Sequence, residues 1–93
     1  MKYIPQDKIN DYLENLKKQE FTWGKNERFF HLMEEVGELS EMYLQYTKKK
    51  TPFKSLEDIE NGLSDIFDDL LALSILFGLD INNVIEKALG DQI

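Results

Sequence analysis

The stretch Glu34-Glu35-Val36-Gly37-Glu38, inside HLMEEVGELSEMYLQY (residues 31–46), places three carboxylates within five residues, and Glu41 adds a fourth. On an α-helix, positions four and seven residues apart share a face, so Glu34, Glu38 and Glu41 are predicted to form one acidic row. Like charges one turn apart destabilise an isolated helix by about 0.2–0.5 kcal/mol per pair. The row therefore predicts either a face covered by water or a set of ligands for a cation.

Apolar residues on both sides of this stretch recur with helical spacing and predict four helices. The first covers residues 5 to about 19, starting at Pro5, and the second runs from an N-cap at Asn26 to about residue 48. The third opens at a capping box of Ser55 and Asp58 and ends near residue 77 at Gly78. The fourth covers residues 81 to about 89 after Asp80.

Spacing also predicts which side of each long helix is buried. The second helix is expected to bury the apolar row Phe29, Leu32, Val36, Leu39, Tyr43 and Tyr46 and to turn its acidic row away. The third is expected to bury Leu63, Ile66, Phe67, Leu70, Leu71, Leu73, Ser74 and Phe77, opposite a polar side with Asp58, Gly62, Asp65 and Asp69. That polar side continues as Ala72 and Leu76, so the second half of the helix is expected to be covered nearly all round. The predicted fold is an all-α bundle with two long central helices and two shorter flanking ones.

Composition limits the class of protein. Ninety-three residues suit a single domain (1–93), and the absence of cysteine excludes a thiolate site. A net charge of -7 argues against a nucleic-acid partner, which needs a basic surface. With neither a leader nor an apolar run long enough for a membrane span, we expect a cytoplasmic protein. A chain this short is only modestly stable alone, so association of subunits would stabilise it.

Two facing helices that each offer carboxylates one turn apart are a common way to build a cation site from side chains. Oxygen ligands favour Mg²⁺, with Mn²⁺ as a substitute, and Mg²⁺ held this way keeps positions that phosphates fill. His31 is the only histidine, and we expect it at the surface rather than as a ligand. The alternative is an acidic face that is simply solvated.

Residues 20 to 87 resemble the MazG-like all-α nucleotide pyrophosphohydrolases, relatives of dimeric dUTPases and phosphoribosyl-ATP pyrophosphatase. The EExxE motif of that family is met by Glu34, Glu35 and Glu38, and the Asp of its ExxD motif by Asp65. FGLD at 77–80 matches the turn before the last helix. The resemblance implies Mg²⁺-dependent hydrolysis of an NTP or dNTP to a monophosphate and pyrophosphate. It also implies that Glu35, Glu38 and Asp65 bind metal, and that Glu34 binds metal or orients water. Self-association to a dimer or tetramer is a further implication of the resemblance.

The chain departs from the motif at position 62, where Gly62 replaces the Glu of ExxD. A glycine inside a helix predicts a close approach by a neighbouring element. We expect Asp68 or Asp69 to supply the missing metal ligand, and a catalytically weak nucleotide-binding or interaction module is the alternative function. The residues expected to bind substrate are Trp23, as a base-stacking ring unless it plugs the core, with Lys25, Asn26, Lys54 and Lys87.

Overall fold

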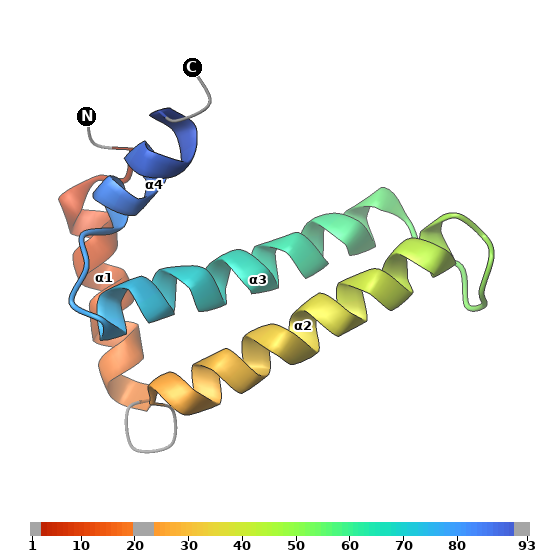
Figure 1. Ribbon diagram of the computed structural model, residues 1–93, viewed down its shortest axis with the longest axis horizontal. Coiled ribbons are helices and arrows are strands. Elements are labelled where there is room, and N and C mark those ends of the chain that lie inside the picture. The colour runs from red at the N-terminus through yellow and green to blue at the C-terminus, as the bar shows by residue number, and fades with distance from the viewer. Residues whose placement is uncertain (1–2, 20–23, 91–93) are drawn as a thin grey trace.

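The computed structural model describes residues 3–19 and 24–90, and these form four α-helices (Figure 1): α1 (Gln6–Gln19), α2 (Lys25–Tyr46), α3 (Leu56–Leu76) and α4 (Ile81–Gly90). The two long helices α2 and α3 form an antiparallel hairpin, and α1 crosses the end of it where α2 begins and α3 ends. No strand occurs in the described ranges. The prediction of an all-α fold with four helices is therefore confirmed.

Local sequence signals set the start of α3 and of α4. The Asp58 amide donates to Ser55 Oγ (3.3 Å), and the Ser55 amide donates to Asp58 Oδ2 (2.8 Å), which is the predicted capping box. After Gly78, which has a φ of +74°, the Asp80 carboxylate accepts the amide of Asn82 (2.9 Å) at the start of α4. At the start of each of these two helices, a side chain two or three residues away thus accepts one of the free amides.

The ends of α2 differ from the prediction. Gly24, and not Asn26, is the N-cap, and its amide donates to the Glu27 carboxylate (3.3 Å), so Asn26 lies within the first turn. The helix ends at Tyr46, before the predicted residue 48, because Lys48 has a left-handed backbone (φ 63°). The error arose because asparagine is a strong N-cap signal in a sequence, whereas a glycine whose amide is bound by a carboxylate three residues later is a weak one.

The prediction of the buried sides of α2 and α3 was wrong for most residues. The buried residues of α2 are Arg28 and Gln45, while Phe29 remains 45% exposed. In α3, Leu73 and Ala72 are buried as expected, but Gly62 and Asp69 are buried on the predicted polar side. The seam along which the two helices meet therefore contains buried charge, which is tolerated because the facing helix brings a partner for it.

Apolar side chains form an exposed surface on one side of this hairpin. Seven-residue spacing places Phe29, Val36 and Tyr43 in one row of α2, and Leu63, Leu70 and Phe77 in one row of α3. The rings of Phe29 and Phe77 meet edge to face at 6.1 Å, so both rows lie on the same side. We call these six residues, which are 40% or more exposed, the apolar face.

The chain is less compact than its length predicts. Its radius of gyration is 15.4 Å and its accessible surface 7112 Å², against about 12 Å and about 5,600 Å² for a compact monomer of this size. Within residues 3–19 and 24–90, the buried apolar residues are only Ala72, Leu73 and Ile81. None of the helices in these ranges combines the length and the apolar character that a membrane span requires.

The start of the chain is tied to α4 by one buried amide. Asn82 is 4% exposed, and its Oδ1 accepts the backbone amides of Tyr3 and Ile4, both at 2.8 Å. Its Nδ2 donates to the carbonyl of Ile4 (3.1 Å). This interaction holds the segment before α1 against the beginning of α4.

Gly62 lies where α3 comes closest to α2. A Cβ at this position would lie 3.2 Å from Leu39 Cδ1 and 3.4 Å from Met42 Sδ. The predicted close approach is therefore present, and it comes from α2 itself. A longer side chain at position 62, including the glutamate of the family motif, would have to displace the side chains of Leu39 and Met42.

We predict that Gly62→Glu lowers the free energy of unfolding by about 1–3 kcal/mol, the usual cost of overpacking. Gly37 is the matched control, because it lies in α2 and a Cβ added there would have nothing within 4 Å. Gly37→Ala should stabilise the protein by about 1 kcal/mol through helix propensity, and Gly62→Ala by less. Urea unfolding measures the stability of all three variants. A Gly62→Glu protein as stable as the wild type would contradict the close contact between α2 and α3 at Gly62.

Candidate functional site

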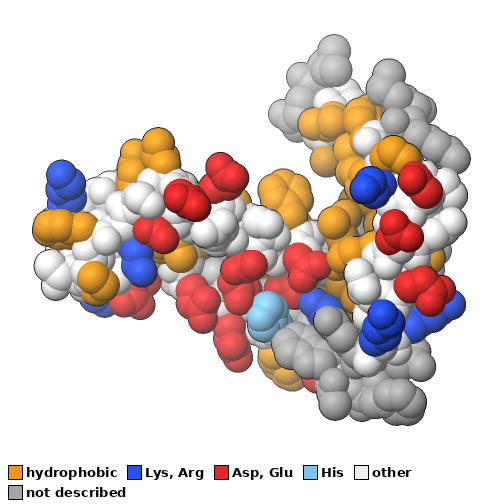
Figure 2. Space-filling view, turned by 180° about the vertical axis from the view of Figure 1, so that it is seen from behind, with side chains coloured by type: hydrophobic (Ala, Val, Ile, Leu, Met, Phe, Trp, Pro, Cys, Tyr) orange, Lys and Arg blue, Asp and Glu red, His pale blue; other side chains and the backbone are white. Residues whose placement is uncertain are grey.

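Carboxylates from α2 and α3 gather along the hairpin around His31 (Figure 2). Glu35 has a side chain only 13% exposed, whereas Glu34 and Glu38 are exposed. Burial raises the pKa of Glu35, and the negative charges of Glu38 and of Asp65 on α3 raise it further. Of the four carboxylates that the EExxE and ExxD patterns select, Glu38 and Asp65 therefore lie close enough to Glu35 to repel it.

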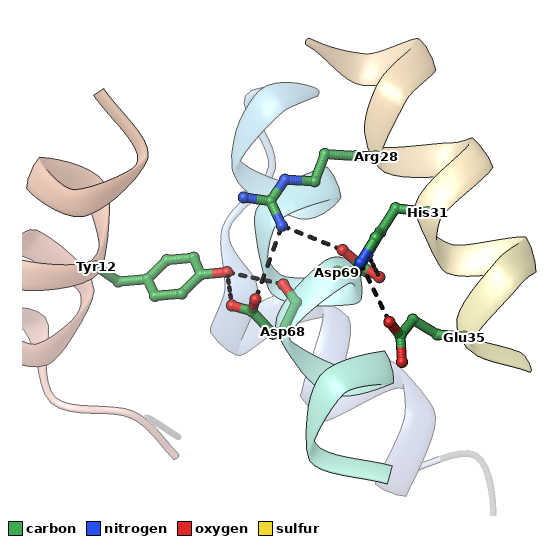
Figure 3. A network of polar contacts seen from close by, with 6 residues as sticks. All are labelled: Tyr12, Arg28, His31, Glu35, Asp68 and Asp69. Carbon is green, nitrogen blue, oxygen red and sulfur yellow. Dashed lines mark hydrogen bonds and ion pairs between the residues drawn. The ribbon is translucent and has the colours of Figure 1, made fainter. Parts of the chain in front are cut away.

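A buried ion pair joins α2 to α3 beside this cluster (Figure 3). Arg28 Nη1 lies 3.1 Å from Asp69 Oδ1, and the two side chains are 7% and 0% exposed. A buried carboxylate without a partner would be strongly unfavourable, and the guanidinium supplies both charge and hydrogen bonds. The pair fixes how α2 and α3 align at this level of the hairpin.

His31 lies between two carboxylates in the same network (Figure 3). Its Nδ1 is 2.6 Å from Asp69 Oδ2, and its Nε2 is 3.2 Å from Glu35 Oε1. Burial alone would lower the pKa of His31, but the hydrogen bond to Asp69 and the charges of Asp69 and Glu35 outweigh it, so the pKa is raised. His31 is therefore part of the site, contrary to the expectation of an isolated surface residue.

The network continues to α1 through Asp68. The Tyr12 hydroxyl donates to Asp68 Oδ1 (2.5 Å) and to the Asp68 carbonyl (2.7 Å), and Arg28 Nη1 lies 3.7 Å from Asp68 Oδ2. Burial and the hydrogen bond to Asp68 raise the pKa of Tyr12, so its hydroxyl keeps its proton. Three helices thus meet around one guanidinium.

A hollow of about 350 Å³ lies next to this junction. It is within the size range of small-ligand sites. Its lining combines an aromatic ring, an amide, two cations and a carboxylate: Tyr12, Asn15, Leu16, Lys18, Arg28 and Asp68. The hollow therefore offers hydrogen-bond donors and acceptors a short distance from the carboxylates.

Within a single copy of the chain, the described residues that were expected to bind substrate lie apart from one another. Lys25 Nζ lies 4.9 Å from the centre of the Phe77 ring, a cation–π contact at the apolar face, and Asn26 is exposed. The loop that holds Lys54 and the helix that holds Lys87 lie at opposite ends of the hairpin (Figure 1). Trp23 lies outside the described residues.

The donor set fits a hard cation in chemistry, since it offers carboxylate oxygens that repel one another in its absence. Within residues 3–19 and 24–90, no group of three or more His, Asp or Glu side chains is arranged to hold a metal ion as it stands. Asp69, a predicted substitute for the Glu missing at position 62, has both oxygens paired with Arg28 and His31. Asp68 is likewise paired with Tyr12 and Arg28.

Arg28 and Tyr12 were missed by reasoning from the sequence. Arg28, His31 and Glu35 stand three and four residues apart, so they share one side of α2, and this row of polar side chains with opposite charges was the available signal. Tyr12 fell within an apolar row of α1, where its hydroxyl gave no indication of a partner 56 residues away.

No family model matches this chain, and neither a curated protein nor a solved structure matches it.

We predict that Arg28→Met and Asp69→Leu each reduce the free energy of unfolding by about 3–5 kcal/mol, because each leaves a buried charge in the seam without its main partner. The double variant should recover at least half of this loss, since two apolar side chains restore packing without a buried charge. Urea unfolding without added metal provides the double-mutant cycle. Additive losses in the double variant would show that the pair is not coupled.

Proposed function

We propose that this protein is a Mg²⁺-dependent nucleoside triphosphate pyrophosphohydrolase. The observation that supports the proposal most is the position of Glu35, a carboxylate of α2 that is only 13% exposed and whose pKa is raised by burial and by the negative charges of Glu38 and of Asp65 on the facing helix α3. A cluster of like charges in a folded protein is unfavourable unless a cation relieves it, and oxygen ligands favour Mg²⁺ or Mn²⁺. These are also the positions that the resemblance to MazG-like enzymes selects.

In this proposal Glu35, Glu38 and Asp65 hold the metal, and Glu34 binds it or orients the attacking water. Bound Mg²⁺ neutralises phosphate charge and makes water a better nucleophile at neutral pH. Glu34 is exposed beside the cluster, and a carboxylate in this position can accept a proton from water. Hydrolysis between the α and β phosphates gives a nucleoside monophosphate and pyrophosphate.

The hollow beside Tyr12 and Arg28 is the proposed place for the nucleoside. Its volume of about 350 Å³ and its mixture of ring, amide and charged groups suit a base and a sugar. Lys18 and Arg28 offer positive charge on the same lining. The start of α2, with Lys25 and Asn26, stays a proposed contact of the substrate.

Self-association belongs to the same proposal. The apolar face leaves the six side chains of two helices in water, and the accessible surface exceeds that of a compact monomer by about 1,500 Å². A second copy with the same face would cover it and supply the core that one hairpin lacks. Burial of large side chains contributes about 1.5–3 kcal/mol each.

A catalytically weak nucleotide-binding or interaction module is the second candidate, and Gly62 supports it. The position of the missing motif Glu is filled by contact with Leu39 and Met42, so this chain has one carboxylate fewer on α3. Asp68 and Asp69 would first have to leave their present partners before either replaced it.

We predict monophosphate and pyrophosphate as products when the purified protein is incubated with a panel of NTPs and dNTPs and Mg²⁺. Glu38→Gln should reduce turnover by about 100-fold or more, because loss of a metal ligand exceeds the 10–100-fold typical of outer-shell changes. Chromatography with a pyrophosphate assay measures both products.

Glu41→Gln is the matched control, since it changes the same charge on the same helix at a residue paired with Lys50 (3.1 Å). It should turn over substrate at the wild-type rate. Absence of turnover in the wild type, with Mg²⁺ and nucleotide still raising the melting temperature, would favour the binding module.

We predict that the wild type sediments as a dimer or larger species and that Leu70→Lys shifts it toward monomer. Loss of one buried apolar side chain should raise the dissociation constant by at least about 10–100-fold. Phe30→Lys is the control, because Phe30 is 66% exposed and lies one residue off the apolar row. Sedimentation equilibrium measures all three proteins, and a wild-type monomer at high concentration would contradict the prediction.

A further inference from the structure

Asp69 occupies a place in the site that the motif does not explain. Its side chain is 0% exposed, one oxygen is 3.1 Å from Arg28 Nη1, and the other is 2.6 Å from His31 Nδ1. A carboxylate with both oxygens engaged inside the seam is a supporting group rather than a ligand open to solvent. Asp69 contacts His31, and His31 in turn contacts Glu35, so Glu35 is the side chain that Asp69 supports.

The ring of His31 lies between Asp69 and Glu35 and contacts both carboxylates. A histidine has two ring nitrogens on opposite sides, so fixing Nδ1 against Asp69 also fixes the direction of Nε2. That nitrogen lies 3.2 Å from Glu35 Oε1. Figure 3 shows the ring between the two carboxylates, with Arg28 on the far side of Asp69.

Glu35 is the member of the cluster that most needs such support. It is 13% exposed while Glu34 and Glu38 are exposed, and the charges of Glu38 and Asp65 act against it. A long carboxylate side chain loses rotamer freedom when it is held in one place, and its repulsion by neighbours favours other rotamers. A partner that holds it in advance lowers the cost of binding a cation.

We propose that His31, held by Asp69 and Arg28, is a positioning residue that fixes the Glu35 carboxylate for cation binding, an inference that rests on the function proposed above. Asp69 then serves the site through His31 and not as a replacement ligand for the motif Glu that Gly62 lacks. The ligand concerned is a hard divalent cation bound by carboxylate oxygens.

The first test uses the single histidine of the chain, whose ring gives one set of NMR signals. In protein labelled with ¹⁵N in the histidine ring, Glu35→Gln should shift the Nε2 signal, because its charged partner is removed. Glu41→Gln, which removes the same charge nearer the end of α2, should leave it in place. Ring signals unchanged by Glu35→Gln would overturn the proposal.

The second test measures Mg²⁺ and Mn²⁺ binding by calorimetry without nucleotide. His31→Ala should weaken binding by about 10–100-fold, as changes to outer-shell partners do, while Glu41→Gln keeps the wild-type affinity. Asp69→Asn should weaken it in the same direction. If that variant does not fold, His31→Ala still decides the matter, because His31 is 32% exposed and its circular dichroism can be checked.

The outcomes separate this inference from the proposed hydrolysis. Cation binding that depends on His31, in a wild type that turns over no nucleotide, refutes the hydrolase and supports the positioning role. Wild-type affinity in a folded His31→Ala protein overturns the positioning role even where turnover is found. A wild type that binds neither cation overturns both.

Discussion

The ion pair between Arg28 and Asp69 sits where three helices meet, and the rest of the arrangement depends on it. Asp69 is completely removed from water, so it requires a partner in the seam, and Arg28 on α2 is that partner. The same guanidinium lies 3.7 Å from Asp68, which accepts the hydroxyl of Tyr12 on α1. The alignment of α2 with α3 and the position of α1 therefore share one positive charge.

A polar seam has consequences for the outside of the hairpin. Because Arg28, Gln45 and Asp69 take the buried positions, the apolar rows that begin at Phe29 and at Leu63 remain at the surface. The hydrophobic effect then favours a further layer over the apolar face. The side chains that stabilise one hairpin are therefore not the side chains that are available for association, although both sets lie on α2 and α3.

The carboxylates of the site differ in how much positive charge lies beside them. Asp69 has Arg28 beside it, whereas the repulsion of Glu35 by Glu38 and Asp65 is offset within the described network only in part, by His31. Gly62 adds a geometric constraint, since Leu39 and Met42 lie against it where the family motif has a carboxylate. A binding site in this cluster would use the side chains already present around Glu35.

The sequence by itself determined the helices and most of their ends, because caps act over three or four residues. Ser55 with Asp58, Gly78 and Asp80 each specify a boundary through bonds to nearby backbone. It also identified Glu35, Glu38 and Asp65, although the roles of these residues remain predictions. Gly62 was correctly expected to permit a close approach.

Only the tertiary structure decided which sides of α2 and α3 face each other. An apolar row shows that a surface favours burial, but it does not say whether the neighbouring helix or another molecule covers it. Helical spacing placed Asp69 on the polar side of α3, opposite the main apolar row, and only the packing brings it to Arg28 and His31 across separations of 41 and 38 residues. A charged residue can be buried only when its partner is in place, and that partner is determined by the packing of the helices rather than by local spacing.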